Sequence, residues 1–210
     1  MRTAGTRMLA CAMLIATALA CGQERPVPQA TVTAPAQDRA PTPNPSPQGD
    51  DEPRKSNIEG SDPRWFEGEV SLADGRRVAM HYRLGEGLFE QHYNPKSGKW
   101  TTPRLIYGTK TDACQSIKLQ ARGDTVTAIA NFGRYCADGE PPTESIAAVG
   151  LGGLRKWDHH LTRSFDGWEH AEITDDGRKA TFVSRSTVVE STLVWTSTGG
   201  FTNPVFKYSD

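Results

Sequence analysis

The chain has 210 residues, 23% of them charged, and a formal net charge of −1. Its 24 lysines and arginines are balanced by 25 aspartates and glutamates, so it lacks the basic excess that phosphate recognition requires. Nucleic acid is therefore excluded as an expected partner. Residues 62–210 remain when an N-terminal leader and a linker are set aside, and they suffice for one domain with its own hydrophobic core.

The first segment, residues 1–20, has the features of a secretory signal peptide. Arg2 and Arg7 make its start positive, and an unbroken apolar run over residues 8–20 follows. This run is too short for a permanent membrane-spanning helix, but it has the length of a signal-peptide core. The pattern predicts that the chain is exported.

The apolar run ends in Ala18-Leu19-Ala20-Cys21-Gly22. This ending resembles the lipobox of bacterial lipoproteins, in which small residues precede a cysteine that becomes the acylated N-terminus. The family usually has leucine three places before the cysteine, where this chain has Ala18. The resemblance implies that Cys21 is lipidated and anchors the chain to the cell membrane, facing the extracytoplasmic side. Cleavage after Ala20 by an ordinary signal peptidase is the alternative, and it would leave a plain secreted protein.

Residues 21–61 are expected to be a disordered, lipid-anchored tether. Eight prolines lie within residues 22–61, with almost no large apolar side chain between them. Such a segment cannot bury enough surface to offset the entropy lost on ordering. Proline at every second position over residues 41–47 favours extended polyproline II, which makes a semi-rigid spacer.

The four cysteines divide between the leader, the anchor and the domain. Cys11 belongs to the leader and Cys21 is the predicted lipid site. Cys114 and Cys136 remain, in a domain predicted to reach an oxidising compartment, and this predicts a disulfide between them. Metal binding is the weaker alternative, because no further Cys or His lies at ligand spacing from either.

The pattern over residues 62–210 predicts an all-β domain built from three repeats. Segments rich in β-branched and aromatic residues are separated by glycine turns, and residues 69–82 read as a hairpin around Asp74-Gly75. Self-comparison then aligns three units. The turn glycines Gly75, Gly123 and Gly177 match, and so do the residues three places later, Val78, Val126 and Ala180. Each unit also has an aromatic residue that opens a strand: Trp100, Trp157 and Phe201. Three places after these aromatics stand Pro103, His160 and Pro204.

Each unit offers about four short strands, which is the content of one propeller blade. A glycine hairpin, a third strand and a Gly-x-Trp-x-x-Pro fourth strand resemble the blades of sialidase-like (BNR-repeat) propellers. The Asp-box of that family is only approximated, at residues 97–100 and 164–168. The resemblance implies three propeller-like four-stranded repeats with about twelve strands. Three blades cannot close a ring, so we expect an open or partial propeller, a completed ring in an oligomer, or a β-sandwich or barrel.

No catalytic, cofactor-binding or metal-binding residue is assigned from the sequence. The run Trp157-Asp158-His159-His160 is the densest polar cluster, but adjacent histidines on a strand point to opposite faces and are not expected to share a metal. No spacing selects an acid/base pair for glycoside hydrolysis among the carboxylates Glu67, Glu69, Asp74, Glu86 and Glu90. The resemblance to sialidases carries over no catalytic residue.

The expected function is therefore that of a cell-envelope binding or structural module. Its ligand would be a glycan, a peptide or an envelope protein, and its membrane contact would be the lipid anchor. The alternative is a sialidase-like glycoside hydrolase that is degenerate or active only as an oligomer. The tryptophans are expected to fill the core rather than to form a carbohydrate platform.

Overall fold

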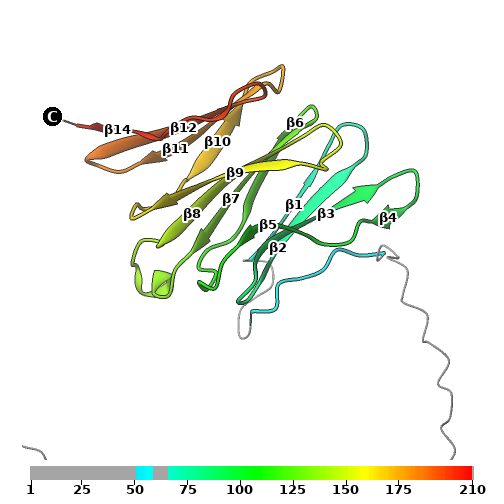
Figure 1. Ribbon diagram of the computed structural model, residues 1–210, viewed down its shortest axis with the longest axis horizontal. Helices are drawn as coiled ribbons and strands as arrows, with labels where there is room; N and C mark the ends of the chain where they lie inside the picture. Colours follow the sequence, from blue (N-terminus) through cyan, green and yellow to red (C-terminus); the bar gives the residue numbers. More distant parts are fainter. Residues whose placement is uncertain (1–50, 59–65, 210) are drawn as a thin grey trace, which may run out of the picture. The chain divides into compact units, whose positions relative to one another are not determined.

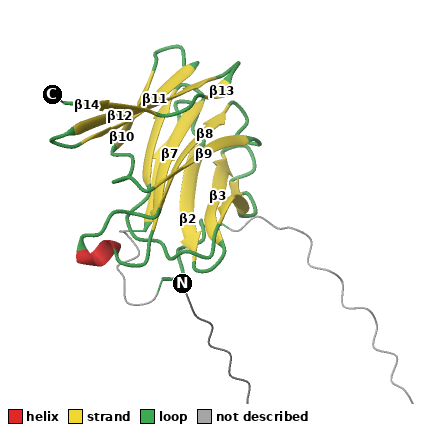
Figure 2. Ribbon diagram, turned by 60° about the vertical axis from the view of Figure 1, so that its left-hand side comes forward, coloured by secondary structure: helices red, strands yellow, loops and turns green. Residues whose placement is uncertain are grey.

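The computed structural model describes residues 51–58 and 66–209 (Figure 1). These residues form fourteen β-strands and one short 3-10 turn, Cys136–Asp138, which is the single red segment in Figure 2. The predicted all-β class is thereby confirmed. Among the described residues, no helix has the length and apolar character needed to span a bilayer. The predicted signal peptide, Cys21 and the 41–47 proline run lie outside the described residues.

The strands form three antiparallel sheets, each built from consecutive strands. Sheet A comprises β1 (Glu67–Ser71), β2 (Arg77–Arg83), β3 (Gly87–Asn94), β4 (Lys99–Trp100) and β5 (Arg104–Gly108). Sheet B comprises β6 (Lys118–Arg122), β7 (Thr125–Phe132), β8 (Glu144–Leu151) and β9 (Trp157–Arg163). Sheet C comprises β10 (His170–Ile173), β11 (Lys179–Arg185), β12 (Val189–Thr196), β13 (Gly200–Phe201) and β14 (Val205–Tyr208).

The fourth strand is broken in sheets A and C but continuous in sheet B. Pro103 lies between β4 and β5, and Pro204 lies between β13 and β14. Proline has no N–H to donate to a β-ladder, so the strand is interrupted there. Sheet B has His160 at the matching position, and β9 runs through it. The three predicted units are present, and the two breaks explain why there are fourteen strands rather than twelve.

The three turn glycines occupy the same place in each sheet. Gly75, Gly123 and Gly177 each lie between the first and second strand, with φ of 87°, 56° and 67°. L-residues with side chains rarely adopt this left-handed conformation, which is why glycine recurs there. The repeat predicted from the sequence is therefore confirmed at the turns.

The side chains that follow these turns do not all face the same way. The first turn spans residues 73–75 and the second spans residues 123–124, one residue fewer. Because successive side chains of a strand alternate between faces, this difference reverses the alternation. Val78 points toward sheet B, while Val126 points back toward sheet A, and the two meet in one buried cluster.

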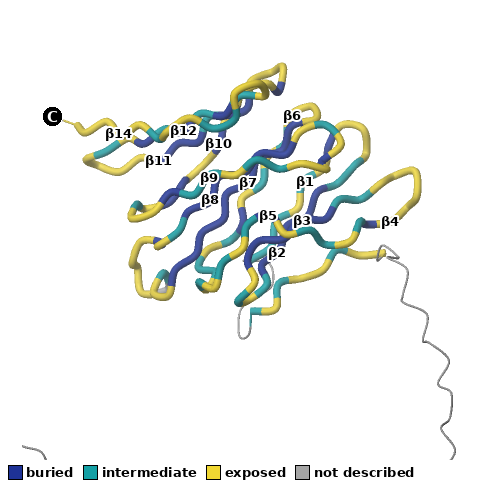
Figure 3. Tube along the Cα trace, viewed as in Figure 1, coloured by how far each residue is buried: buried dark blue, intermediate teal, exposed yellow. Residues whose placement is uncertain are grey.

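Sheet B lies between the other two, with both of its faces buried (Figure 3). Every residue of β7 is buried. On one face Ala128, Ala130 and Phe132 pack against residues of sheet A that include Met80 and Tyr82. On the other face Ile129, Ala147 and Val149 pack against residues of sheet C that include Phe182 and Leu193. The first strands of the sheets, β1, β6 and β10, lie beside one another along one edge of the stack (Figure 1).

The predicted disulfide between Cys114 and Cys136 is present. Their Cα atoms are 5.3 Å apart, within the range that a disulfide requires. The bond joins the connection between sheets A and B to the loop between β7 and β8. That loop spans residues 133–143.

Residues 51–58, which we call the strap, lie against sheet A although the tether was predicted to be disordered up to residue 61. Hydrogen bonds to sheet A fix the strap: Arg54 N–H to Gln91 Oε1 (2.8 Å), Ser56 N–H to Glu67 Oε1 (2.7 Å), Tyr82 N–H to Ser56 Oγ (2.9 Å) and Leu84 N–H to Asn57 Oδ1 (2.7 Å). The Ser56 hydroxyl also donates to the Phe66 carbonyl (3.0 Å). The prediction does not hold for these residues, because their polar side chains supply partners to sheet A that composition alone did not reveal.

Candidate functional site

A groove of about 440 Å³ opens between the inner face of sheet C and the segment that follows β9. Cross-strand partners share one face of a sheet, so Ser184, Ser191 and Phe206, which pair in a row across β11, β12 and β14, all face the groove. The groove is lined by Arg163, Ser164, Phe165, Asp166, Ser184, Ser186, Val189, Ser191, Phe206 and Tyr208.

The wall opposite sheet C is set by the chain reversal after β9. Ser164 has φ of 56°, a left-handed conformation that is uncommon for a residue with a side chain. The Phe165 ring then packs on Trp168, with ring centroids 4.7 Å apart, and meets Phe206 edge-on at 6.2 Å. These ring contacts join the wall to sheet C, and they hold the groove open at a definite width.

Two serine hydroxyls at the base of the groove lack protein partners. Ser184 is 6% exposed and Ser191 is 1% exposed, yet neither side chain makes a hydrogen bond to any described residue. Both residues are largely buried, but their hydroxyl oxygens reach the water in the groove. The two hydroxyls are therefore free to donate to, and accept from, a molecule that enters the groove.

Aromatic rings and two charges surround these hydroxyls. Tyr208 is 77% exposed and Phe206 is 41% exposed, so both rings offer a surface for stacking. Arg163 is mostly exposed and reaches Glu144 only at 3.9 Å, and Asp166 forms no ion pair with any described residue. A polar ligand thus meets stacking surfaces, hydroxyls and one charge of each sign.

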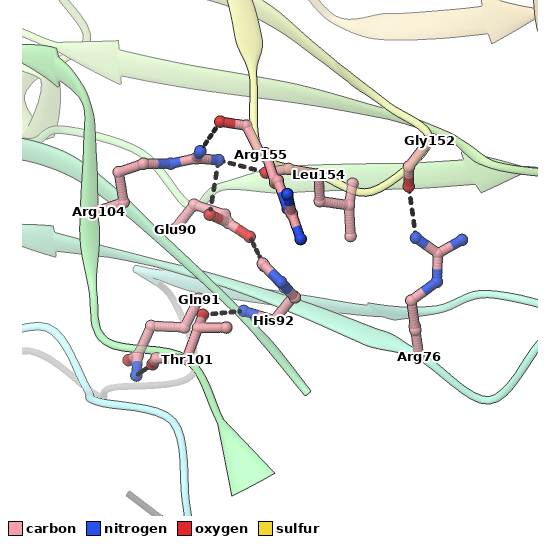
Figure 4. A network of polar contacts seen from close by, with 9 residues as sticks. All are labelled: Arg76, Glu90, Gln91, His92, Thr101, Arg104, Gly152, Leu154 and Arg155. Carbon is pink, nitrogen blue, oxygen red and sulfur yellow. Dashed lines mark hydrogen bonds and ion pairs between the residues drawn. The ribbon is translucent and has the colours of Figure 1, made fainter. Parts of the chain in front are cut away.

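A second polar centre, a buried ionic network, lies between sheets A and B (Figure 4). The Glu90 carboxylate is 1% exposed and is held by His92 Nδ1 at 2.8 Å and by Arg104 Nη2 at 3.1 Å. The Arg104 guanidinium also donates to the main-chain oxygens of Leu154 and Arg155. The charge of Glu90 is thereby matched, and Arg104 joins β5 to the turn between β8 and β9.

Arg76 also binds the turn between β8 and β9. It donates to the carbonyl of Gly152, as Figure 4 shows, and pairs with Asp74 at 2.6 Å and with Asp124 at 2.7 Å. The backbone N–H of Arg76, which donates to Asp74, lowers the pKa of that carboxyl. Since the groups of this network bind one another and the main chain, we assign the network to joining sheets A and B.

The carboxylates singled out in the sequence are spread over sheet A and do not converge. Each has a separate partner in the structure: Glu67 with the Ser56 N–H, Glu69 with Arg77, Asp74 with Arg76, Glu86 with Arg83, and Glu90 with Arg104 and His92. Trp100, Trp168 and Trp195 are buried, as predicted for the core.

The two adjacent histidines of β9 point to opposite faces, as predicted. The His159 ring lies 5.7 Å from Tyr107 of sheet A, and the His160 ring lies 5.8 Å from Phe201 of sheet C. Burial, reinforced by the charge of His159, lowers the pKa of His160. Within residues 51–58 and 66–209, no group of three His, Cys, Asp or Glu side chains is placed to hold a metal ion.

The groove serines were not identified from the sequence, because single serines in strands carry no recognisable motif. The last strand did hold a signal, since Phe206 and Tyr208 alternate with polar positions and so share one face. Comparisons of the chain with protein-family models, with curated proteins and with solved structures find no significant match.

Proposed function

We propose that this chain is a cell-envelope lipoprotein whose β domain binds a glycan in the groove between sheets B and C. The observation that carries the proposal is the pair of hydroxyls, on the largely buried residues Ser184 and Ser191, that open into the groove without a protein partner. A sugar offers hydroxyls that both donate and accept, so it can satisfy both serines at once.

The aromatic rings support the same ligand class. Small-ligand sites combine apolar and aromatic walls with a few placed polar groups. Phe165, Phe206 and Tyr208 would stack on the C–H faces of a sugar ring while the serines bind its edge. Asp166 is the one carboxylate of the groove lining, whereas glycoside hydrolysis uses a pair. Recognition without hydrolysis is therefore the activity we propose.

The stack of three sheets supports a relationship to propeller blades. The sheets follow one another in chain order, and their first strands lie side by side, as the inner strands of adjacent blades do. On this proposal the domain is an open, partial propeller of the sialidase-like type, anchored by the lipid on Cys21 and facing the extracytoplasmic side.

Calorimetric titration of the full chain with cellohexaose, chitohexaose and oligogalacturonic acid tests the binding proposal. At least one oligosaccharide should bind, and Ser184→Ala and Ser191→Ala should each weaken it about fivefold, since one hydrogen bond contributes about 1 kcal/mol. Ser97→Ala, in an exposed turn of sheet A, is the matched control and should bind as the unaltered chain does. Absence of binding by all three sugars, or binding by both groove variants that is as tight as that of the unaltered chain, contradicts the proposal.

The anchor has its own test. Mass spectrometry of the mature protein should find Cys21 as the N-terminal residue, carrying thioether-linked diacylglycerol. Cys21→Ala should abolish that modification and release the protein from the membrane fraction. An unmodified Cys21, or cleavage at another position, would leave the groove proposal intact and remove the anchor.

A further inference from the structure

His81 is a buried histidine that has no polar partner. Its side chain lies on the face of sheet A that points away from sheet B, and the residue is 1% exposed. Neither ring nitrogen makes a hydrogen bond, and the ring stacks on Phe89 with centroids 5.7 Å apart. The site therefore accommodates a neutral imidazole and offers nothing to bind the second proton of an imidazolium.

The strap passes over this histidine. Its contacts fall on both sides of β2, because Arg54 is bonded to Gln91 of β3 and Ser56 is bonded to Glu67 of β1. Glu67 is the cross-strand partner of His81 on β1, and Phe89 is its partner on β3. Gln91 lies two residues beyond Phe89 and therefore on the same face. The strap thus bridges the two neighbours of His81 and covers the ring.

The charged side chains of sheet A beside His81 are bonded to partners other than His81: Arg77 to Glu69 and Arg83 to Glu86. β2 contributes Arg77 and Arg83 to this face, and the Arg83 guanidinium lies 5.2 Å from the Phe89 ring centroid. The carboxylate on this face nearest in register is Glu67, which accepts the Ser56 N–H of the strap. The strap itself carries four exposed charged residues, Asp51, Glu52, Arg54 and Lys55. The main-chain N–H of Arg54 is bonded to Gln91.

We propose that the strap is a pH-sensitive clasp, which leaves sheet A when the imidazole of His81 takes up a proton from water. An imidazolium beneath the docked strap would be a buried, unpaired cation beside arginine. Departure of the strap lets water solvate it and frees Glu67, its cross-strand neighbour, to pair with it. One N–H bond forms at the imidazole as hydronium gives up its proton, and the proton returns to water when the strap docks again.

The direction of the pH dependence follows from linkage. Burial, and then the charges of Arg83 and Arg54, lower the pKa of His81 from 6.5 to about 4. A histidine whose pKa is lower when docked than when released stabilises docking fully above about pH 6.5, and this contribution is lost as the pH falls toward 4. With these two values the docking equilibrium weakens about 30-fold between pH 8 and pH 5.

Release of the strap would lengthen the free chain between the membrane and the domain. This consequence alone rests on the proposed lipid anchor. Release of residues 51–58 adds about 26 Å of extended chain between anchor and domain. An acidic environment would therefore let the domain stand farther from the membrane surface.

NMR spectroscopy of the chain from residue 21 onward, with Cys21→Ser so that no lipid is attached, tests the clasp. The amide signals of Tyr82 and Leu84 report docking, because both amides donate to the strap. They should shift together as the pH falls from 7.5 to 4.5, and His81→Phe, which keeps a ring against Phe89, should abolish that shared shift. His170→Gln, at an exposed histidine of sheet C, is the matched control and should retain it.

A reciprocal measurement keeps the test decisive if His81→Phe does not fold. Ser56→Ala combined with Asn57→Ala removes two strap acceptors, and the His81 ring signals should then titrate close to pH 6.5 instead of well below it. The proposal is overturned if His81→Phe leaves the shared shift in place, or if His81 titrates at the same pH with and without the two strap acceptors. Neither result depends on glycan binding.

Discussion

Replacing Arg104 with methionine tests whether the buried ionic network holds sheets A and B together. The substitution keeps an apolar stem but removes the cation beside Glu90, which is 1% exposed, and the donors to the Leu154 and Arg155 carbonyls. Removing one partner of a buried ion pair destabilises by about 3–5 kcal/mol, because the other charge is left uncompensated. The Arg104 side chain is 36% exposed, so water can partly replace it beside Glu90. We therefore expect the free energy of unfolding to fall by about 3 kcal/mol, the lower end of that range.

Equilibrium urea unfolding, followed by tryptophan fluorescence, measures this loss. For a domain of this size, 3 kcal/mol corresponds to a fall in Tm of about 6–12 °C. Glu90→Gln in the Arg104→Met background removes the uncompensated charge, so the double variant should be more stable than Arg104→Met alone. Arg122→Met is the matched control, because Arg122 pairs with Asp175 on the surface, where ion pairs contribute little. The reasoning is refuted if Arg104→Met costs no more than Arg122→Met, or if the Glu90 and Arg104 substitutions are additive.

Two further substitutions probe the fold. Cys114→Ser should lower the free energy of unfolding by about 3 kcal/mol, because the bond to Cys136 closes a loop in the unfolded chain, and a variant as stable as the oxidised parent would contradict this. Gly150→Ala should cost about 1–3 kcal/mol by thermal denaturation, because its Cβ would lie 2.6 Å from the Trp157 ring, whereas Gly153→Ala, with open space around it, should cost far less. Equal effects of the two glycine substitutions would show that the Trp157 contact does not constrain position 150.

Features that depend on local chemistry were predictable from the sequence. A left-handed turn requires glycine, so Gly75, Gly123 and Gly177 marked the first hairpin of every unit. Proline cannot donate to a ladder, and Pro103 and Pro204 lie where strands are interrupted. Each of these effects is confined to a few neighbouring residues, and for that reason it can be read without knowledge of the fold.

The candidate site was not predictable in the same way. Ser184 and Ser191 differ from other strand serines only because the row they form opens into a groove. His81 is unusual because both ring nitrogens are buried without a partner beside the strap, and the strap was predicted to be disordered. Both properties arise from which surfaces meet, and a single sequence does not record that.

The sequence by itself determined the all-β class, the three-unit repeat, the partner of each domain cysteine and the opposite orientation of His159 and His160, because turn chemistry, strand periodicity and the small number of cysteines decide these locally. The tertiary structure alone decided that sheet B is buried on both faces, that Val78 and Val126 face each other, and that Glu90 is matched by Arg104. The physical reason is that burial and charge compensation depend on contacts between segments far apart in the sequence, such as Arg76 and Gly152. The register of such contacts is set by loop lengths and packing rather than by any local signal.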